Sequence, residues 1–183
     1  MSIQAGEFIF IILKPAAAKD KQLSEVIKNE LKAYGNIKHF KKNIIVKKNI
    51  ILEHYKASQS ARWYPLITDY LSNKLVHCFI LEPHWDKYYF DSREIGFGEF
   101  LKSQVIGPAD FRKTQKHHIR RLALKKVTFF VDNLIHSSDN ADDALNEIRL
   151  WYANDPHVIA EYEEKSLILK SVNSRSSFSD ILV

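Results

Sequence analysis

The chain has 183 residues, of which 45% are hydrophobic and 12% aromatic, and it carries a formal net charge of +5. This composition predicts one ordinary domain with a substantial apolar core and room for an appendage. The modest positive charge suits a ligand that carries phosphate without requiring nucleic acid, and no apolar run approaches the roughly 20 residues that a membrane helix needs.

Two further features bear on the cellular setting. The N-terminus lacks the basic, apolar and small-residue pattern of a secretory signal. The single cysteine, Cys78, lies inside an apolar run and is most simply a small core residue in a reducing compartment. We therefore expect a cytoplasmic protein that has no membrane partner.

The first predicted element is a continuous apolar run over residues 7–13. Such a run is typical of a central strand that is buried on both faces. Pro15 ends the strand, because proline cannot donate to a hydrogen-bond ladder. Lys14, at the C-terminal edge of this strand, is either a solvated strand end or a cation directed into a cleft.

The elements that follow combine helices with strands. Apolar spacing and punctuating residues predict strands over residues 7–13, 36–46, 75–81 and 127–131. The same criteria predict helices over residues 22–34, 50–57, 62–72 and 140–152. This order predicts an α+β sandwich in which helices cover one face of a single antiparallel sheet.

Two segments fall outside this regular pattern. Residues 82–126 form a long connection that contains the basic run 112–121. Connections of this length are usually functional or disordered, so the basic run is either a solvated loop or a phosphate-binding arm. Beyond residue 152 we expect a short segment near 159–162, a small edge strand at 166–169 and a serine-rich end that frays.

A lone histidine, His136, follows the last predicted strand and precedes the last predicted helix. The turn that carries it includes Ser138 and Asp139, short polar residues of the kind that cap a helix N-terminus. A histidine in such a turn is more often a surface or packing residue than a catalyst. The rest of the chain decides its interpretation.

Six motifs change that interpretation, and they occur in a fixed order. They are Leu13-Lys14-Pro15, Glu53-His54-Tyr55, Trp63-Tyr64 with Tyr70-Leu71, Pro108-Ala109-Asp110, Asn133-Leu134-Ile135-His136-Ser137-Ser138-Asp139 and Glu147-Ile148-Arg149-Leu150-Trp151-Tyr152. Their order and spacing resemble the nucleoside diphosphate kinase family over about residues 7–152. The resemblance implies that family's ferredoxin-like fold, an α/β sandwich with a four-stranded antiparallel sheet and helices packed on it.

The resemblance implies a phosphotransferase in which His136 is the nucleophile. His136 would accept the γ-phosphoryl group of a nucleoside triphosphate and pass it to a nucleoside diphosphate in a ping-pong cycle. A neutral imidazole nitrogen suits this role, because it attacks phosphorus and can also leave again. By the same resemblance, Glu147 orients the other ring nitrogen and Ser138 places a hydroxyl near the transferred phosphate.

The resemblance also implies the residues that bind the nucleotide, since phosphoryl transfer depends on positioning and charge neutralisation. Lys14 corresponds to a lysine that contacts phosphate, and it is expected to act in catalysis as well as in binding. Asn133 corresponds to an asparagine that contacts the sugar, and Tyr55 to an active-site tyrosine. Trp63 lies where the family stacks an aromatic ring on the base, a contact that tolerates any base.

The segment 82–132 is longer than the family's and should supply two arginines to the phosphates. Arg93 and Arg120 are the best matches, whereas Ile106 replaces a threonine that contacts phosphate and cannot donate a hydrogen bond. In the family this segment helps to assemble hexamers. We therefore expect a homo-oligomer, a dimer or higher, with the hexamer in doubt. Mg²⁺ is expected to accompany the nucleotide, and no cluster of protein metal ligands is predicted.

Two further departures from the family lie beside the site. Ser137 replaces the glycine that follows the nucleophile, and serine is strained if the backbone there is left-handed. Ala16-Ala17-Ala18 replaces an acid and a glycine after Pro15, so the polar contacts of that turn should be missing.

We therefore expect a nucleoside diphosphate kinase-like domain over residues 1–155, with an enlarged basic loop at about 83–126, and a partly disordered C-terminal extension over 156–183. Three alternatives to an active kinase stay open. The pocket could serve a different phosphoryl or nucleotidyl acceptor, or it could bind nucleotides with weak or no turnover. The basic run could instead grip a nucleic-acid backbone.

Overall fold

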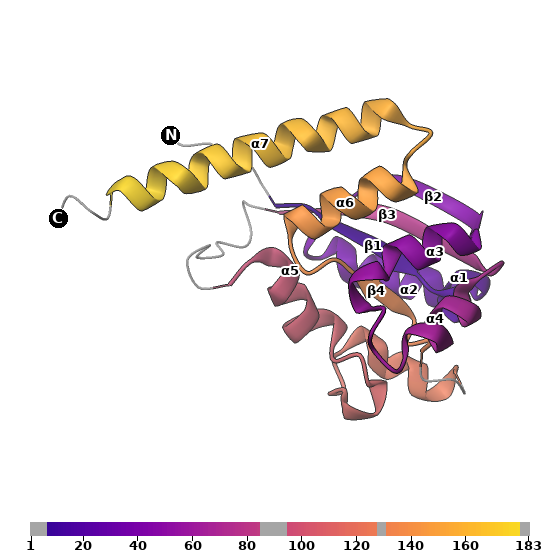
Figure 1. The fold of residues 1–183 in the computed structure, drawn as a ribbon. Coiled ribbons are helices and arrows are strands. Elements are labelled where there is room, and N and C mark those ends of the chain that lie inside the picture. The colour runs from indigo at the N-terminus through magenta and orange to yellow at the C-terminus, as the bar shows by residue number, and fades with distance from the viewer. Residues whose placement is uncertain (1–6, 85–94, 128–130, 180–183) are drawn as a thin grey trace.

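The protein is described by a computed structural model that covers residues 7–84, 95–127 and 131–179, with side chains as far as Ser171. Its centre is a four-stranded antiparallel sheet with the order β2-β3-β1-β4 (Figure 1). The strands are β1 (Ile9–Leu13), β2 (Gly35–Ile45), β3 (Leu75–Pro83) and β4 (Ile135–Ser137). The ferredoxin-like α+β fold predicted from the sequence is confirmed.

The fourth strand is not where the apolar run suggested. The prediction of a strand at 127–131 is wrong at its two ends, since Val127 and Val131 lie outside the strands, and residues 128–130 are outside the described part of the chain. The strand begins at Ile135 instead, which pairs with Leu13 of β1. The chain reaches this position through Leu134, whose φ of 71° turns the backbone just before the strand.

Helices connect the strands and follow the last of them. They include α1 (Pro15–Lys19), α2 (Lys21–Lys32), α3 (Lys48–His54), α4 (Tyr64–Leu71), α6 (Ala141–Trp151) and α7 (Pro156–Ser179). The N-cap of α6 is Asn140, whose side chain accepts a hydrogen bond from the backbone N–H of Asp143. The prediction of a cap at Ser138 or Asp139 was therefore one or two residues too early, and both residues are left beside the strand end.

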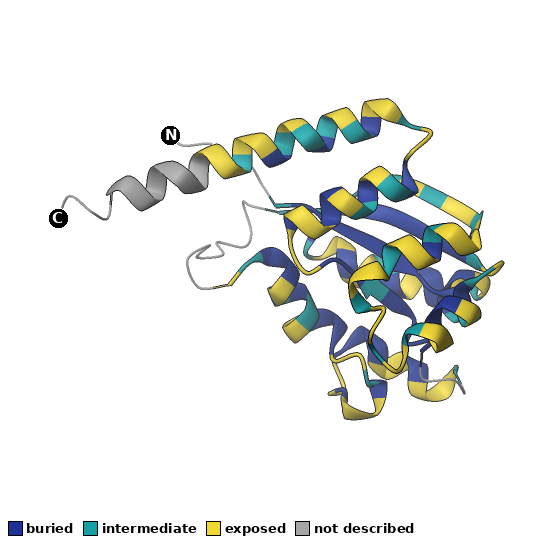
Figure 2. Cartoon of the chain, in the orientation of Figure 1, coloured by how far each residue is buried: buried dark blue, intermediate teal, exposed yellow. Residues whose placement is uncertain are grey.

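Helices cover both faces of the sheet, which corrects the prediction of one covered face. On one face Phe8, Phe10 and Ile12 of the first apolar run pack in a core with α3, α4, α6 and α7. On the other face Ile9, Ile11 and Leu13 pack with α1, α2 and the segment 97–123. The alternation follows the two-residue period of a strand. It explains why β1 is apolar at every position and why its residues are dark in Figure 2.

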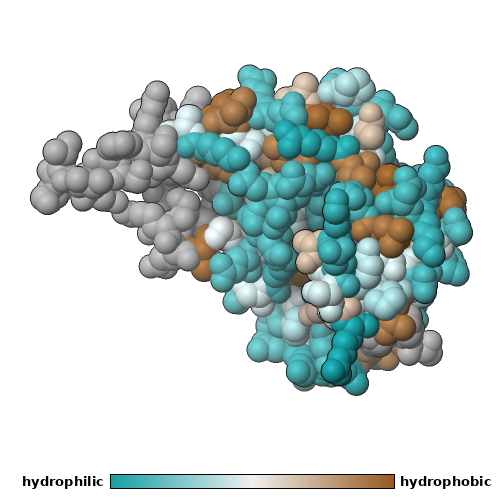
Figure 3. Space-filling model, in the orientation of Figure 1, coloured by the Kyte–Doolittle hydropathy of each residue, from teal (hydrophilic) through white to brown (hydrophobic). Residues whose placement is uncertain are grey.

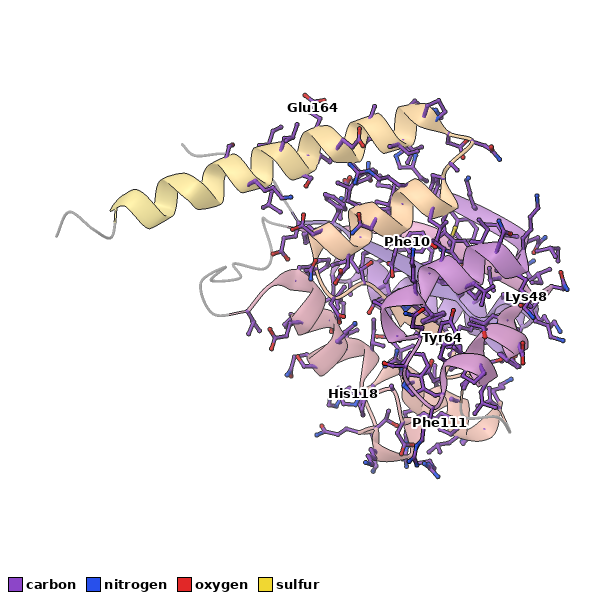
Figure 4. All side chains as sticks on the ribbon, in the orientation of Figure 1. Phe10, Lys48, Tyr64, Phe111, His118 and Glu164 are labelled. Carbon is purple, nitrogen blue, oxygen red and sulfur yellow. The ribbon has the colours of Figure 1, made fainter. Side chains whose placement is uncertain are left out.

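The segment that lacked a pattern in the sequence forms a series of short helices. They are α5 (Phe97–Phe100), the π-helical η2 (Leu101–Ile106), and the 3-10 helices η3 (Phe111–Lys113) and η4 (Ile119–Lys125); a further 3-10 turn, η1 (Lys56–Ser58), follows α3. Phe111 and His118 lie in this region (Figure 4). At Gly107, φ is +87° and an added Cβ would meet His118 at 2.7 Å, so this turn requires glycine.

The C-terminal part of the chain is one helix. The prediction of a short segment and an edge strand at 166–169 is wrong, because α7 continues from Pro156 to Ser179. Val158, Tyr162 and Ser166 recur every fourth residue and are buried, so one face of the helix packs on the domain. The end of α7 extends past the sheet and the other helices (Figure 1).

Hydrophilic residues cover most of the face drawn in space-filling form, with small hydrophobic patches between them (Figure 3). Among the described residues, no helix combines the length and the apolar character that crossing a bilayer demands.

Candidate functional site

A cavity of about 1120 Å³ lies beside the C-terminal end of β1 and the edge strand β4. Its walls come from α3 and the turn that follows it, from η2 and η4, and from the first turns of α6. The residues predicted for the site that line this cavity are Lys14, Tyr55, Trp63, Arg120, Asn133, His136, Ser138 and Glu147. Arg93, the other predicted site residue, lies outside the described residues.

His136 is delivered to this cavity by β4, where it pairs with Ile12 of β1. Its Nε2 atom lies 2.8 Å from Oε1 of Glu147, and both side chains are more than four-fifths buried. Burial, followed by the charges of Lys14 and Lys102, holds the pKa of His136 well below its usual value. The imidazole is therefore neutral near pH 7. A neutral ring that donates from Nε2 to a carboxylate keeps an unprotonated Nδ1.

Glu147 is held in place from its second oxygen. The Ser138 hydroxyl lies 2.6 Å from Glu147 Oε2 and donates to it, while Ser138 Oγ accepts a hydrogen bond from the backbone N–H of Phe10 at 3.0 Å. A serine hydroxyl has one proton. Phe10 O, at 3.2 Å, is a second possible acceptor, and the shorter contact with the carboxylate favours donation to Glu147. Ser138 therefore lines the cavity but directs its proton to Glu147, and through Glu147 it helps to orient His136.

Lys14 is a buried cation and not a solvated strand end. Its side chain leaves the end of β1 with the residue 4% exposed, and Nζ donates to Val131 O and to Asn133 Oδ1, each at 2.8 Å. Burial and then the charge of Arg120 lower the pKa of Lys14 to about 7, and Asp132 opposes this shift. Near pH 7 the ligand-free site therefore holds Lys14 in both protonation forms. The protonated form has three donors and keeps one of them for an anionic ligand, whose charge would favour protonation.

Arg120 is the second buried cation at the cavity. Its Nη1 donates to Gly107 O at 2.7 Å and its Nη2 to Ile135 O at 2.9 Å, while Nε has no partner among the described residues. Burial lowers the pKa of Arg120 to about 10, so the guanidinium stays charged at neutral pH. Within residues 7–84, 95–127 and 131–171, neither Arg120 nor Lys14 forms an ion pair with a carboxylate. Buried charges are normally paired, so these two favour an anionic ligand.

Asn133 completes this polar wall. Its Oδ1 accepts the hydrogen bond from Lys14, and its Nδ2 donates to Ala109 O at 2.8 Å. The amide therefore links the lysine to the Pro108-Ala109-Asp110 motif, which the sequence had placed in an unpatterned segment.

Two aromatic rings, those of Tyr55 and Trp63, also line the cavity. Tyr55 follows the end of α3, with its ring centroid 6.0 Å from that of His136 and 5.9 Å from that of Trp63. Burial raises the pKa of the Tyr55 hydroxyl well above its usual value, so it is a neutral donor. Trp63 is 38% exposed at the start of α4. A half-exposed indole at the rim of a cavity is well placed to stack on a planar ligand.

The structure adds residues that the sequence did not single out. Lys102, on the π-helical η2, lines the cavity and forms an ion pair with Asp139. No helical or strand period marks this segment, so no signal in the sequence placed Lys102 near His136. His54 also lies here, with a fully buried side chain and its ring 4.6 Å from that of His136. It belongs to the Glu53-His54-Tyr55 motif, which could have drawn attention to it.

His54, His136 and Glu147 offer ligand atoms that all lie within 4.8 Å of one another. This spacing alone would permit a metal ion. However, the indole N–H of Trp151 points to Nδ1 of His54 at 3.2 Å. An indole N–H only donates, so Nδ1 accepts and the ring proton is on Nε2. A metal ion on Nε2 would force that proton onto Nδ1, against the indole. The cluster is therefore better described as a hydrogen-bonded group.

Two departures from the family pattern are accommodated in the structure. Ser137 is absent from the described non-glycine residues with positive φ and lies within β4, so serine needs no strained backbone here. The turn after Pro15 also keeps a polar contact, because the Asp132 carboxylate accepts hydrogen bonds from the backbone N–H of Ala16 at 3.0 Å and from the Tyr70 hydroxyl. The prediction that this turn lacks polar contacts is therefore wrong.

Ile106, the third departure, is fully buried in the core at the end of η2. Its side chain packs there and offers no donor, so hydrogen bonds to a phosphate must come from other residues of the cavity.

The family model of nucleoside diphosphate kinase matches residues 7–156. A comparison with curated protein sequences gives no match.

Solved structures give a consistent comparison. The nucleoside diphosphate kinase of Aquifex aeolicus is 24% identical with a TM-score of 0.59, and the match covers 79% of this chain and 93% of that one. The enzyme of Encephalitozoon cuniculi is 21% identical with a TM-score of 0.60, over 79% and 88% of the two chains. That of Halobacterium salinarum, solved in complex with CDP, is 18% identical with a TM-score of 0.59, over 79% and 86%. At these identities the likeness shows a shared fold.

The family assignment thus rests on the sequence model, and the fold agrees with it. Because that model spans most of the chain, the chain belongs to the nucleoside diphosphate kinase family and is a phosphotransferase.

Proposed function

We propose that this chain transfers the γ-phosphoryl group of a nucleoside triphosphate to a nucleoside diphosphate, with Nδ1 of His136 as the intermediate carrier. One observation supports this most directly. A neutral imidazole is held from Nε2 by Glu147 at 2.8 Å, while the buried cations Lys14 and Arg120 line the same cavity without a carboxylate partner among the described residues. A nucleophile and unpaired positive charge are the two requirements of phosphoryl transfer.

In the first half-reaction the lone pair on Nδ1 attacks the γ-phosphorus. The bond between that phosphorus and the bridging oxygen breaks, and its electron pair leaves with the nucleoside diphosphate. The ring keeps its proton on Nε2 and becomes a positively charged N-phosphoimidazole. Glu147 stabilises this charge through the hydrogen bond that it already accepts. No proton has to move.

In the second half-reaction a terminal oxygen of another nucleoside diphosphate attacks the phosphohistidine. The N–P bond breaks and its electron pair returns to Nδ1, so the neutral ring is restored. Lys14 and Arg120 neutralise the transferring group in both directions, and Lys102 becomes a third cation at the cavity when it exchanges Asp139 for a phosphate oxygen. The same residues serve both half-reactions, as a ping-pong cycle requires.

The remaining walls suit the other parts of a nucleotide. Trp63, with Tyr55 behind it, supports stacking on the base, and stacking of this kind does not discriminate between bases. Asn133 lies between Lys14 and Ala109 and is assigned to the sugar. These roles favour a broad range of nucleoside diphosphates and triphosphates as substrates.

Mg²⁺ is proposed to enter with the nucleotide. Asp139 and Asp143, beside the start of α6, line the cavity and offer the oxygen ligands that Mg²⁺ prefers. Burial, followed by the charges of Asp139 and Glu147, raises the pKa of Asp143, so negative charge is crowded here and a divalent cation would relieve it. Bound Mg²⁺ supplies neutralisation of phosphate charge, and Asp139 and Asp143 are the residues that would hold it.

The wider setting is proposed from the sequence and from Cys78. Cys78 is a buried free thiol, as expected in the reducing cytoplasm. The family resemblance supports a homo-oligomer, whose size sedimentation analysis would determine.

The mechanism is tested by incubating the protein with ATP that carries radiolabel in the γ-phosphate. Wild-type protein should acquire a label that is labile in acid and stable in alkali, and His136→Ala should abolish it. His117→Ala, which removes an exposed histidine of the basic run, is the matched control and should keep the label. A wild-type protein that binds ATP without becoming labelled would reject the proposal and indicate a nucleotide-binding protein.

A further inference from the structure

We infer that Trp151 and His54 fix the ring tautomer of His136, through Glu147, and so determine which nitrogen accepts the phosphoryl group. This inference rests on the proposed function for its catalytic consequence, although the tautomers themselves exist without any substrate. Both are positioning residues, because they are proposed to act on His136 through Glu147 and not by contact with the substrate.

The first step is the contact between Trp151 and His54. Trp151 is 8% exposed, and its Nε1 donates to His54 Nδ1 at 3.2 Å. Because indole nitrogen is never an acceptor, His54 Nδ1 must carry its lone pair there. The proton of the neutral His54 ring is therefore on Nε2. An exposed histidine would exchange between tautomers freely, whereas this one is held in a single form.

The second step is the direction of the His54 Nε2–H group. The His54 side chain is fully buried, and Nε2 has no hydrogen-bond partner among the described residues. Its nearest charged neighbour is Oε1 of Glu147 at 3.7 Å. This separation is too long for a hydrogen bond, but at this distance His54 still acts electrostatically on the carboxylate that holds His136, and it opposes the rise that burial causes in the pKa of Glu147.

His54 is neutral, so it does not compete with His136 for an ion pair with Glu147. Burial, followed by the charge of His136, lowers the pKa of His54 to about 3, so the ring stays neutral. A protonated His54 would form its own ion pair with Glu147 and draw the carboxylate away from His136. The neutral ring leaves the negative charge available to the nucleophile.

The third step is the hydrogen-bond balance at Glu147. The Ser138 hydroxyl donates to Oε2 at 2.6 Å. Burial raises the pKa of Glu147, while the neighbouring His54 and the Ser138 hydrogen bond oppose this rise and favour the ionised carboxylate, which can only accept. With Glu147 as the ionised acceptor, His136 Nε2 at 2.8 Å from Oε1 carries the proton, and the lone pair of His136 is on Nδ1. The indole N–H of Trp151 thus determines, through His54 and Glu147, which nitrogen of His136 carries the lone pair.

Removing the indole donor should allow both tautomers at His54 and at His136. In Trp151→Phe, the His54 proton is free to move to Nδ1, which turns a lone pair of Nε2 toward Glu147 Oε1. Two facing lone pairs repel, so Glu147 moves away from His136 or takes up a proton. Either change allows the His136 proton to occupy Nδ1, where it blocks attack. Phosphorylation should slow roughly tenfold if about one tenth of the molecules keep the competent tautomer.

The experiment is nitrogen NMR on ligand-free protein with ¹⁵N-labelled histidine side chains. In wild-type protein, His54 and His136 should each show a protonated Nε2 and an unprotonated Nδ1. Trp151→Phe should give a mixture of tautomers at both rings and a slower single-turnover phosphorylation by ATP. Tyr152→Phe is the matched control, because it removes a buried hydrogen bond to His39 O one residue along the chain and should leave both tautomers unchanged.

A second pair of variants guards against a Trp151→Phe protein that does not fold. In His54→Gln the amide oxygen can accept from Trp151 and the amide N–H can face Glu147, so the His136 tautomer should be retained. His54→Leu offers neither group and should lose it. The inference is overturned if wild-type His54 is protonated on Nδ1, or if the Gln and Leu variants have the same His136 tautomer.

The inference and the proposed function fail in different ways. Predicted tautomers in a wild-type protein that is never labelled by ATP would support the inference and reject the phosphohistidine. A labelled wild-type protein whose His136 tautomer ignores Trp151 and His54 would do the reverse.

Discussion

Lys14 offers the sharpest test of the site's electrostatics, because its charge is buried without an ion pair among the described residues. The perturbation is Lys14→Met, which keeps the length of the side chain and removes its titration. Burial lowers the pKa of Lys14 from 10.5 to about 7 in the folded protein, whereas the unfolded chain keeps the ordinary value. Between these two values the unfolded state binds more protons, so the free energy of unfolding of the wild type should rise with pH.

The size of this rise follows from the two pKa values. Below pH 7 Lys14 is protonated in both states and contributes no slope. At pH 7 half of the folded molecules have lost the proton, and by pH 9 nearly all have, whereas the unfolded chain keeps it. The slope therefore approaches about 1.4 kcal/mol per pH unit, and stability gains roughly 2 kcal/mol between pH 7 and pH 9. Lys14→Met should lack this gain.

The measurement is urea unfolding of both proteins at pH 6, 7, 8 and 9, with equal m-values as the check that the unfolded states are comparable. The difference between the two free energies of unfolding isolates Lys14 from the other titrating groups. A difference that stays constant from pH 6 to pH 9 would show that Lys14 keeps an ordinary pKa, and the argument from burial would be refuted.

Three further substitutions test the rest of the site. Glu147→Gln keeps the shape but replaces a charge-assisted hydrogen bond worth about 1.5–3 kcal/mol, so single-turnover phosphorylation of His136 should slow roughly 10- to 100-fold; an unchanged rate would remove Glu147 from the mechanism. Trp63→Ala removes a stacking surface worth about 1–3 kcal/mol, so nucleotide affinity measured by calorimetry should fall by similar factors for purines and pyrimidines, and loss for one class alone would contradict non-selective stacking. Ser137→Gly should lower the free energy of unfolding by about 0.5–1 kcal/mol, the usual cost of glycine in a strand, without raising turnover; a several-fold faster enzyme would show that serine does restrict this position.

Much of the fold was predictable because its strands obey simple rules. Residues 8–13 are all apolar because this strand has a core on each of its faces. Residues 75–81 are apolar except for His77, for the same reason in β3. The fourth strand was misplaced because β4 has only three residues and two of them, His136 and Ser137, are polar. Three residues are too few to show the two-residue period of a strand. The longer apolar run at 127–131 was therefore predicted to be the strand.

The C-terminal helix was missed for a different reason. Leu167, Ile168 and Leu169 suggested a strand because apolar neighbours in succession are typical of one. In α7, however, Leu167 is 69% exposed and Ile168 is 42% exposed, so they are not the residues that attach the helix. Val158 and Tyr162 attach it, and their four-residue spacing is a weak signal among charged neighbours.

The candidate site was predictable where motifs fix it and not where distant segments meet. Lys14, Asn133, His136 and Glu147 each belong to a motif, and the structure brings them together. Lys102 reaches the cavity only through a π-helical segment that lacks a sequence period. The contact between His54 and Trp151 joins residues 97 positions apart, and no local pattern reveals such a pair.

The register of β4 also constrains how the protein acquires its activity during synthesis. His136 lies opposite Ile12 in the sheet, so the proposed nucleophile and the strand that supports it come from opposite ends of the domain. Contacts between residues so distant in sequence form late, because closing the intervening chain costs entropy before the pairing repays it. Until residue 137 has left the ribosome, β1 can pair with β3 but presents its other edge unpaired, and unpaired edges are where nascent chains associate wrongly. The three residues of β4 therefore add the last strand of the sheet and pair with the free edge of β1. The same folding step brings His136 to the candidate site.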